Sequence, residues 1–236
     1  MSQFANDVQK TLDADRPDSV RMSAEEAAAV GMRALKALGY SDEDAKIVVD
    51  QLIDNALCGY RFASLPRILA IATDPKHLKG RQPIKIDHET PLSALMNGNN
   101  NIGYVTCYRA AMLAAEKAKK TGFASVGVYN SYYSGRNAYY VEHIVNAGLA
   151  VMHFATGKLL VLPPGGLRPA LGTNPVSFGF PSKRGPVIVD FGTAYGIWLL
   201  TNGATWTQLH AATSTGIVTA DIDRNGRADI VIDFTA

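Results

Sequence analysis

The sequence predicts an α/β protein in which N-terminal helices precede a mixed sheet with covering helices, followed by a short all-β segment with the pattern of a propeller blade. Three observations predict this fold class. Two helical patterns occur before residue 60, strand and helix patterns alternate between residues 97 and 181, and short β-rich runs without a helix signal follow residue 187. The composition agrees, because 47% of the 236 residues are hydrophobic and 19% are charged, as in a chain that folds around a core.

Charge and hydropathy exclude several classes of partner. The net charge is +2, and the two signs are spread along the chain, so neither nucleic acid nor an anionic membrane is an expected partner. No apolar run approaches the roughly 18 residues of a membrane span, and the first twenty residues are polar without a signal-peptide core. The two cysteines, Cys58 and Cys107, have no metal-binding spacing. These features favour a cytoplasmic location.

Two helices are expected at the start of the folded region. Residues 1–20 lack apolar periodicity and are expected to form a flexible arm. Ser23-Ala-Glu-Glu26 is a capping box, which predicts a helix that ends at Gly39. Ser41, followed by three acidic residues, predicts the start of a second helix that ends at Gly59.

The middle of the chain alternates between helix and strand patterns. A turn-rich stretch over residues 97–103 leads into an amphipathic helix over residues 104–121, which Gly122 closes. A strand over residues 124–129, a helix over 139–146 and a strand over 149–155 follow. This β-α-β alternation predicts a layered α/β structure with ligand-binding groups on the connecting loops.

The last 50 or so residues carry a repeated strand. Val-Ile-Val-Asp-Phe at residues 187–191 and Ile-Val-Ile-Asp-Phe at residues 230–234 are near copies, separated by the spacing of a propeller blade. Repeat architectures normally need three or more such units. The expected organisation is therefore an arm over residues 1–20, an α/β domain over 21–190 and a β-rich repeat over 191–236.

A candidate calcium loop lies within this repeat. Asp221, Asp223 and Asn225 place side-chain oxygens at alternate positions, Gly226 allows a turn, and Asp229 adds a further carboxylate. An EF-hand is disfavoured, because a twelfth-position glutamate is absent and the flanks have strand patterns. The stretch resembles the calcium loop of FG-GAP and VCBS repeats. The alternative is an Asx-rich β-turn without a metal ion.

Residues 21 to about 193 carry a second resemblance, which rests on four motifs in a fixed order. They are the segment from Gly59 to Arg67, the stretch 97–103 with its helix, the loop from Asn130 to Tyr140, and the glycine-rich pieces 163–166 and 172–175 with Asp190. Together these motifs resemble the malate/L-lactate dehydrogenase family of the second type, which includes ureidoglycolate dehydrogenase. A G-x-G-x-x-G fingerprint is absent, and the resemblance implies a non-Rossmann fold that binds a nicotinamide cofactor.

The resemblance also implies a cofactor, a partner and site residues. NAD or NADP and a homodimer are expected. The implied cofactor-binding residues are Asn130, Ser131, Gly135, Thr173, Asn174, Pro175 and Asp190. The family continues well beyond the position of Asp190, so a truncated homologue, a fusion and an assembly artefact all stay open. Without the resemblance, residues 172–175 would be interpreted as an ordinary turn.

The sequence departs from the family pattern where catalytic residues are expected. Tyr133 occupies the position of a histidine in the active-site loop, and Gly59-Tyr60 stands where a serine–histidine pair is usual. Tyr133 or Tyr60 is therefore the candidate proton donor, although an ordinary tyrosine pKa near 10 matches neutral pH poorly. Arg67 and Arg136 are candidates to clamp a substrate carboxylate. The tyrosines of these segments are equally compatible with packing roles, and none of the histidines has a partner motif.

Two functions from different classes follow. The first is an oxidoreductase that interconverts a small 2-hydroxy acid, or a cyclic imine analogue, with its oxidised form by means of NAD(P). The second is a non-catalytic, calcium-stabilised binding module that retains a remnant dehydrogenase domain. Calcium binding separates the two, because a ligand that binds only the native state raises its stability.

Overall fold

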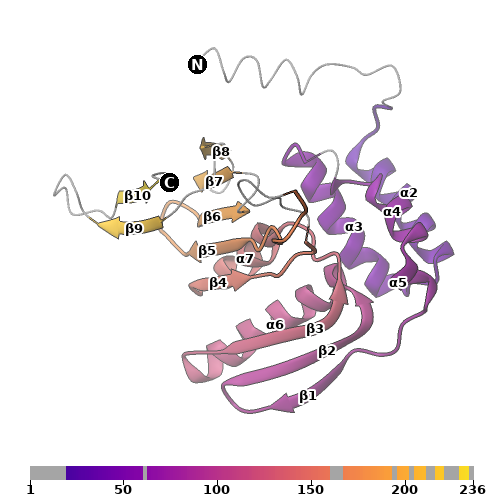
Figure 1. Ribbon diagram of the computed structural model, residues 1–236, viewed down its shortest axis with the longest axis horizontal. Coiled ribbons are helices and arrows are strands. Elements are labelled where there is room, and N and C mark those ends of the chain that lie inside the picture. Colours follow the sequence, from indigo (N-terminus) through magenta and orange to yellow (C-terminus); the bar gives the residue numbers. More distant parts are fainter. Residues whose placement is uncertain are drawn as a thin grey trace. The chain divides into compact units, whose positions relative to one another are not determined.

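The computed structural model describes residues 20–60, 63–159, 167–192, 196–201, 205–210, 216–220 and 229–233 (Figure 1). From residue 192 onward the description is of the backbone alone. The contacts divide the chain into two compact units, Met1–Arg81 and Gln82–Ala236.

The first unit is helical. It contains α2 (Ala24–Ala37), α3 (Asp42–Leu57), α4 (Arg67–Thr73) and the short α5 (Pro75–Leu78). The predicted capping box of α2 is confirmed, because the Glu26 N–H donates to Ser23 Oγ at 3.1 Å and the Ser23 N–H donates to Glu26 Oε2 at 2.8 Å. Gly39 and Gly59 follow the two long helices at φ +79° and +85°, a backbone conformation that glycine adopts without a steric penalty.

Helices α2 and α3 pack through their small and branched residues. Leu35, Val48 and Leu52 are fully buried between them. Gly31 on α2 lies where a Cβ atom would come within 2.9 Å of Leu65 Cδ2 and Val49 Cγ2, so the glycine allows close packing. Neither α4 nor α5 was anticipated from the sequence.

The second unit begins with a three-stranded mixed sheet. It contains β1 (Lys85–Glu89), β2 (Ser93–Ile102) and β3 (Ser125–Tyr132), in the order β1-β2-β3. β1 runs antiparallel to β2, whereas β2 and β3 are parallel and are joined by α6 (Gly103–Thr121). Helix α6 packs against β2 and β3 (Figure 1). β2, α6 and β3 therefore form a β-α-β unit, in which the crossover helix covers one face of its own sheet.

One expectation for this region needs correction. The stretch 97–103 is not a separate turn but the end of β2, running directly into α6. Asn99 and Asn100 nevertheless have φ of +45° and +63°, and the pairing of β2 with β3 is irregular between Asn97 and Asn101. The asparagines that indicated a turn therefore form an irregularity within a strand. The predicted alternation of strand, helix and strand over residues 124–155 is confirmed as β3, a helix over Asn137–Asn146 and a strand over Val151–Phe154, although the two strands lie in different sheets.

A second sheet has five antiparallel strands. It contains β4 (Val151–Phe154), β5 (Val176–Phe180), β6 (Val187–Gly192), β7 (Gly196–Thr201) and β8 (Thr205–His210), in chain order. Helix α7 (Asn137–Asn146) packs on β4, β5 and β6. It approaches β5 at Gly179, where a Cβ atom would overlap Val141 and Val145. Val141 and Ile188 are fully buried in this layer.

In the described residues, strands from the β-rich end of the chain belong to two sheets, and the blade-like repeat stays a prediction. β6 pairs with β5 on one side and with β7 on the other, so β7 and β8 extend the same sheet. β9 (Gly216–Ala220) and β10 (Asp229–Asp233) form a separate two-stranded sheet. The near-copy strands therefore lie in different sheets. The predicted domain boundary at residue 190 stays a prediction.

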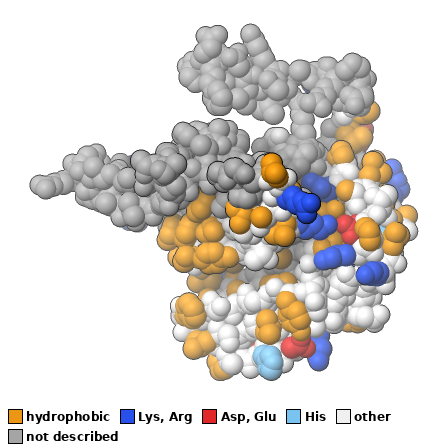
Figure 2. Space-filling model, in the orientation of Figure 1, with side chains coloured by type: hydrophobic (Ala, Val, Ile, Leu, Met, Phe, Trp, Pro, Cys, Tyr) orange, Lys and Arg blue, Asp and Glu red, His pale blue; other side chains and the backbone are white. Residues whose placement is uncertain are grey.

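Hydrophobic side chains gather on the surface over β4 and β5 (Figure 2). Met152, Phe154 and Phe180 are between 50% and 61% exposed. They alternate along their strands with residues that face α7, such as Val151. Within the described part of the chain, every helix is too short or too polar to cross a membrane.

Candidate functional site

The loop after β3 carries the candidate proton donor Tyr133 in a fixed conformation. Tyr133 has φ +54°, an unusual value for a bulky residue, and its carbonyl accepts the N–H of Tyr104 at 3.1 Å. The next carbonyl, that of Ser134, accepts the hydroxyl of the fully buried Tyr140. Gly103 permits the approach, since a Cβ atom there would lie 2.8 Å from Ser134 N and Cα. The starts of α6 and α7 therefore hold this loop from both sides.

Asp190 anchors the start of α7. Its Oδ2 accepts the N–H of Ala138 at 3.0 Å, and its Oδ1 accepts the hydroxyl of Ser177 at 2.5 Å. Burial raises the pKa of Asp190, while the hydrogen bonds from Ser177 and Ala138 and the charge of Arg136 act in the opposite direction. The carboxylate is thus occupied by protein groups, and it fixes the helix that follows the Tyr133 loop.

Arg136 lies at the same helix start. It is the N-cap residue of α7 and is only 8% exposed. Its charge lowers the pKa of Asp190, so the two groups lie close together. A guanidinium buried beside a carboxylate is partly committed to it. The role of Arg136 as a carboxylate clamp stays a prediction.

Two glycine-containing loops meet beside the second sheet. The N–H of Gly157, after β4, donates to Asn174 Oδ1 at 3.1 Å, and the N–H of Ala155 donates to the Pro175 carbonyl at 3.1 Å. A Cβ atom at Gly172 would lie 2.6 Å from the Gly157 carbonyl oxygen. A Cβ atom added at Gly157 would lie 3.0 Å from Thr173 Oγ1, so Thr173 also packs against Gly157. The predicted cofactor segment 172–175 is therefore packed against the loop that follows β4.

That loop brings a cation to Tyr133. Lys158 Nζ lies over the Tyr133 ring, 5.8 Å from its centroid. The Lys158 side chain is exposed, whereas Tyr133 is partly buried. Sequence reasoning missed Lys158, because a single lysine in a loop carries no motif. Only the meeting of the two loops places it next to the candidate proton donor.

Asn130 and Ser131 fasten β3 to β2. Asn130 has φ +50° and donates from Nδ2 to Asn97 Oδ1 at 3.1 Å. Ser131 Oγ donates to the Asn101 carbonyl at 2.9 Å and lies 3.3 Å from Thr106 Oγ1. Gly135 has φ +75°, in the left-handed region. These predicted cofactor residues thus shape the turn from which the Tyr133 loop emerges.

A polar network extends from Asn97 across the open face of the first sheet. Asn97 Nδ2 donates to Tyr129 Oη at 2.9 Å, the Tyr129 hydroxyl donates to Asp87 Oδ2, and Lys85 Nζ lies 3.2 Å from Asp87 Oδ1. The hydrogen bond from Tyr129, with a smaller effect of Lys85, lowers the pKa of Asp87. The same bond raises the pKa of Tyr129. Sequence reasoning did not identify this network, since its members are distant in the chain.

Tyr60 and Arg67 belong to the first unit. The Tyr60 N–H donates to the Asn55 carbonyl at 2.8 Å, and Arg67 is the first residue of α4, with its N–H on the Ser64 carbonyl at 2.8 Å. Both side chains are partly buried. Their predicted roles in proton transfer and carboxylate binding stay predictions.

Two buried polar atoms lie near the α7 start. Asn137 is 2% exposed, and its Nδ2 donates to the Pro175 carbonyl at 3.4 Å. Within the described residues, neither Asn137 Oδ1 nor His153 Nδ1 has a hydrogen-bond partner. Burial lowers the pKa of His153 to about 4, so this histidine is neutral at pH 7. Burial also raises the pKa of the Cys107 thiol to about 12, which leaves it unreactive as a nucleophile.

The predicted calcium ligands Asp221, Asp223 and Asn225 lie outside the described residues, and Asp229 is the first residue of β10. Among the described side chains, no group of three or more His, Cys, Asp and Glu residues could hold a metal ion. The calcium site stays a prediction.

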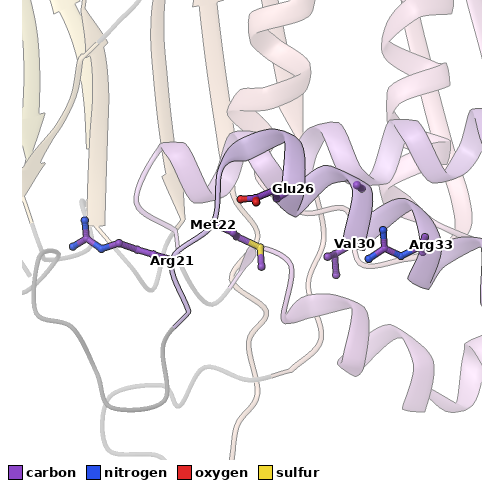
Figure 3. Close-up of a pocket in the computed structure, with 6 residues that line it drawn as sticks. Arg21, Met22, Glu26, Val30 and Arg33 are labelled. Carbon is purple, nitrogen blue, oxygen red and sulfur yellow. The ribbon is translucent and has the colours of Figure 1, made fainter.

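A shallow pocket of about 390 Å³ lies along α2 in the first unit. Arg21, Met22, Glu26, Val30 and Arg33 line it, together with Ala29 (Figure 3). None of the predicted site residues belongs to this pocket.

Comparisons with known proteins agree with the fold and with the motif order. The family model described as malate/L-lactate dehydrogenase matches residues 22–197. The L-sulfolactate dehydrogenase of Methanothermobacter thermautotrophicus is 36% identical over 177 residues, which cover 74% of this chain and 52% of that protein. The malate dehydrogenase of Pyrococcus abyssi is 36% identical over 179 residues, covering 74% and 49%.

Solved structures show the same similarity. The malate dehydrogenase of Pyrococcus horikoshii OT3 aligns with a TM-score of 0.70 at 30% identity, over 76% of this chain and 52% of that one. The sulfolactate dehydrogenase of Methanocaldococcus jannaschii aligns with a TM-score of 0.68 at 29% identity, over 74% and 51%. The chain thus spans about half the length of the relatives that it matches.

Proposed function

The chain belongs to the malate/L-lactate dehydrogenase family, and we propose from this that it interconverts a small 2-hydroxy acid and the corresponding 2-keto acid with a nicotinamide cofactor. The observation that carries the proposal is the Tyr133 loop. By its motif it resembles the family's active-site loop. Its backbone is held by Tyr104 and Tyr140, and a cation lies over its tyrosine.

One buried hydrogen-bond acceptor among the described residues is compatible with a bound nicotinamide cofactor. Asn137 Oδ1 is an acceptor without a donor in the described part of the chain, and the carboxamide of a nicotinamide ring is a donor of the required kind. Thr173 and Asn174, on the loop beside Gly157, are the proposed groups for the rest of the cofactor. When bound, the cofactor would accept the hydride from the hydroxy acid or return it to the keto acid.

Tyr133 is the proposed acid and base. In the oxidation of a hydroxy acid its phenolate would take the hydroxyl proton, and in the reverse direction its phenol would give that proton to the keto oxygen. Arg67 is the proposed partner of the substrate carboxylate, because a guanidinium binds a carboxylate through two parallel hydrogen bonds. Tyr60 is the alternative proton donor.

Cofactor binding and turnover test the proposal. We expect the full chain to bind NADH or NADPH in a fluorescence titration and to oxidise at least one of lactate, malate and sulfolactate. Tyr133→Phe should lower kcat by about 100-fold or more, the usual contribution of a general acid or base. Tyr108→Phe is the matched control, since the Tyr108 ring on α6 makes an edge contact with His143 on α7. Absence of binding by both cofactors would exclude the activity.

The remaining expectations are separate proposals. A homodimer, a cytoplasmic location and the choice between NAD and NADP come from the resemblance and the sequence pattern. Calcium binding at Asp221, Asp223, Asn225 and Asp229 is tested by thermal unfolding with calcium and with EDTA. An unchanged melting temperature would exclude it.

A further inference from the structure

Lys158 is the cation that the fold brings to Tyr133. It follows β4, whereas Tyr133 follows β3, and the two strands lie in different sheets. The ammonium nitrogen nevertheless lies 5.8 Å from the centroid of the Tyr133 ring. The resemblance to the dehydrogenase family, based on motifs, did not point to this lysine.

Both sides of the pair are held by backbone hydrogen bonds. The Tyr133 carbonyl accepts the Tyr104 N–H at 3.1 Å, at the first turn of α6. On the other side, the Gly157 N–H donates to Asn174 Oδ1 at 3.1 Å, immediately before Lys158. The flexible lysine side chain therefore starts from a backbone position that a hydrogen bond adjoins, and the Tyr133 backbone is held in the same way. An accidental approach of two mobile loops would lack these contacts.

The charge of Lys158 is not shared with a carboxylate in the described residues, where it forms no ion pair. Asp190, on β6 of the same sheet as β4, is bound to Ser177 and to the α7 start. The elements around the Tyr133 loop carry further titratable and charged groups. On β3 and β4 they are Tyr129, Tyr132 and His153, at the α7 N-cap Arg136, and on α7 Tyr139, Tyr140, Glu142 and His143; on α6 they are Tyr104, Cys107, Tyr108, Arg109, Glu116, Lys117, Lys119 and Lys120. Of these, His153 is neutral at pH 7.

We propose that Lys158 is a positioning residue that stabilises the phenolate form of Tyr133 and thereby lets a tyrosine act in place of the family's histidine. The ammonium lies over the ring that carries the phenolate charge, and a nearby positive charge favours the charged form of an acid. In keto acid reduction, the phenol O–H bond breaks, the proton goes to the keto oxygen, and the ammonium stabilises the phenolate that remains. In the opposite direction the phenolate accepts the hydroxyl proton. This inference rests on the proposed function.

The titration of Tyr133 tests the pair without any need for turnover. The full chain is labelled with [¹³Cζ]tyrosine, and Tyr133→Phe identifies the Tyr133 signal. We expect the titration midpoint of that signal to move to higher pH in Lys158→Gln and to return toward the wild-type position in Lys158→Arg. Lys119→Gln, which removes an exposed charge from the last turn of α6, is the matched control and should leave the midpoint unchanged.

Activity provides the second readout. Lys158→Gln should lower kcat for oxidation of the hydroxy acid at neutral pH by roughly 3- to 10-fold, with the activity recovered as the pH rises and more phenolate forms. An unmoved Tyr133 midpoint in Lys158→Gln would overturn the inference, as would a rise in KM with an unchanged pH profile. A chain that binds no cofactor would remove the proposed function, whereas the NMR titration would still report whether Lys158 acts on Tyr133.

Discussion

The carboxylate of Asp190 on β6 accepts the N–H of Ala138 at 3.0 Å and so caps the first turn of α7 from a neighbouring sheet. The sequence assigned Asp190 to cofactor binding by resemblance. The structure shows a carboxylate whose second oxygen accepts the Ser177 hydroxyl at 2.5 Å. An anion at a helix N-terminus is favourable, because it lies at the positive end of the helix dipole. Asp190 thus supports the Tyr133 loop through the helix that follows it.

Removal of the Ser177 hydroxyl should weaken this support. Ser177→Ala takes away a hydrogen bond that lowers the pKa of Asp190, so that pKa should rise further above its ordinary value. A raised folded-state pKa means that stability is present at low pH and is lost as the pH rises through the folded pKa. We therefore expect the variant to lose about 1 kcal/mol at pH 7, and less in acid.

Urea unfolding at several pH values measures this effect. Ser125→Ala is the matched control, because Ser125 is an exposed serine on β3. If the loss of unfolding free energy in Ser177→Ala stayed constant with pH, the Ser177 hydroxyl would not act through the ionisation of Asp190.

His153 should make the protein sensitive to acid. Burial lowers its pKa to about 4 from an ordinary value of 6.5, so the unfolded chain binds the proton more readily. Stability should therefore fall as the pH drops from 6.5 toward 4, by up to about 3 kcal/mol. His153→Phe keeps an aromatic ring beside Tyr140, whose ring centroid is 5.5 Å away, and removes the proton site.

Thermal or urea unfolding between pH 4 and pH 7 checks the prediction. The stability of His153→Phe should depend less on pH than that of the wild type. Met152→Leu alters the adjacent strand position without a titratable group and should keep the wild-type slope. If stability depended on pH with the same slope in the wild type and in His153→Phe, His153 would not be the acid-sensitive group.

Local signals predicted the helices well. The capping box at Ser23, the serine before α3 and the glycines after α3 and α6 each act through atoms a few residues apart. Sequence periodicity and capping chemistry report such local interactions directly. The structure accordingly has α2, α3 and α6 close to the expected bounds.

Sheet partners and site neighbours depend on long-range contacts, and there sequence reasoning failed. The strand pattern at residues 187–191 is compatible with pairing to the α/β sheet or to the C-terminal strands. In the structure this strand, β6, pairs with both β5 and β7. Lys158 carries no motif, and its approach to Tyr133 exists only because two loops from different sheets meet. The same reasoning explains why Asp87 and Tyr129 were missed.

Gly103 should be intolerant of a side chain. A Cβ atom there would lie 2.8 Å from Ser134 N and Cα and 3.0 Å from Tyr133 C, and backbone atoms cannot rotate away. Gly103→Ala should cost roughly 1–3 kcal/mol and displace the Tyr133 loop. Gly127→Ala is the matched control, because its nearest neighbour is the movable Leu95 Cδ1 at 3.3 Å. Equal unfolding midpoints for the two variants would argue against a close approach at Gly103.

The two N-caps of the first unit provide a test of reciprocal capping. Ser23 and Ser41 each accept the N–H of the residue three positions later, at 3.1 Å in both cases. Only Glu26 returns a hydrogen bond to its cap, and the bond from the Ser23 N–H lowers the pKa of Glu26. Ser23→Ala and Ser41→Ala should each cost about 1 kcal/mol.

The Glu26 carboxylate makes the cap of α2 dependent on pH. Because the Glu26 pKa is lowered in the folded state, its stabilising effect is present above the ordinary pKa of 4.5 and is lost as the pH falls through the folded value. Glu26→Gln should therefore flatten the acid side of the stability profile, while Ser41→Ala should lower stability evenly across that range. Urea unfolding of the three variants between pH 3 and pH 7 distinguishes these outcomes. A Glu26→Gln profile parallel to that of the wild type would show that the returned hydrogen bond contributes nothing to folding.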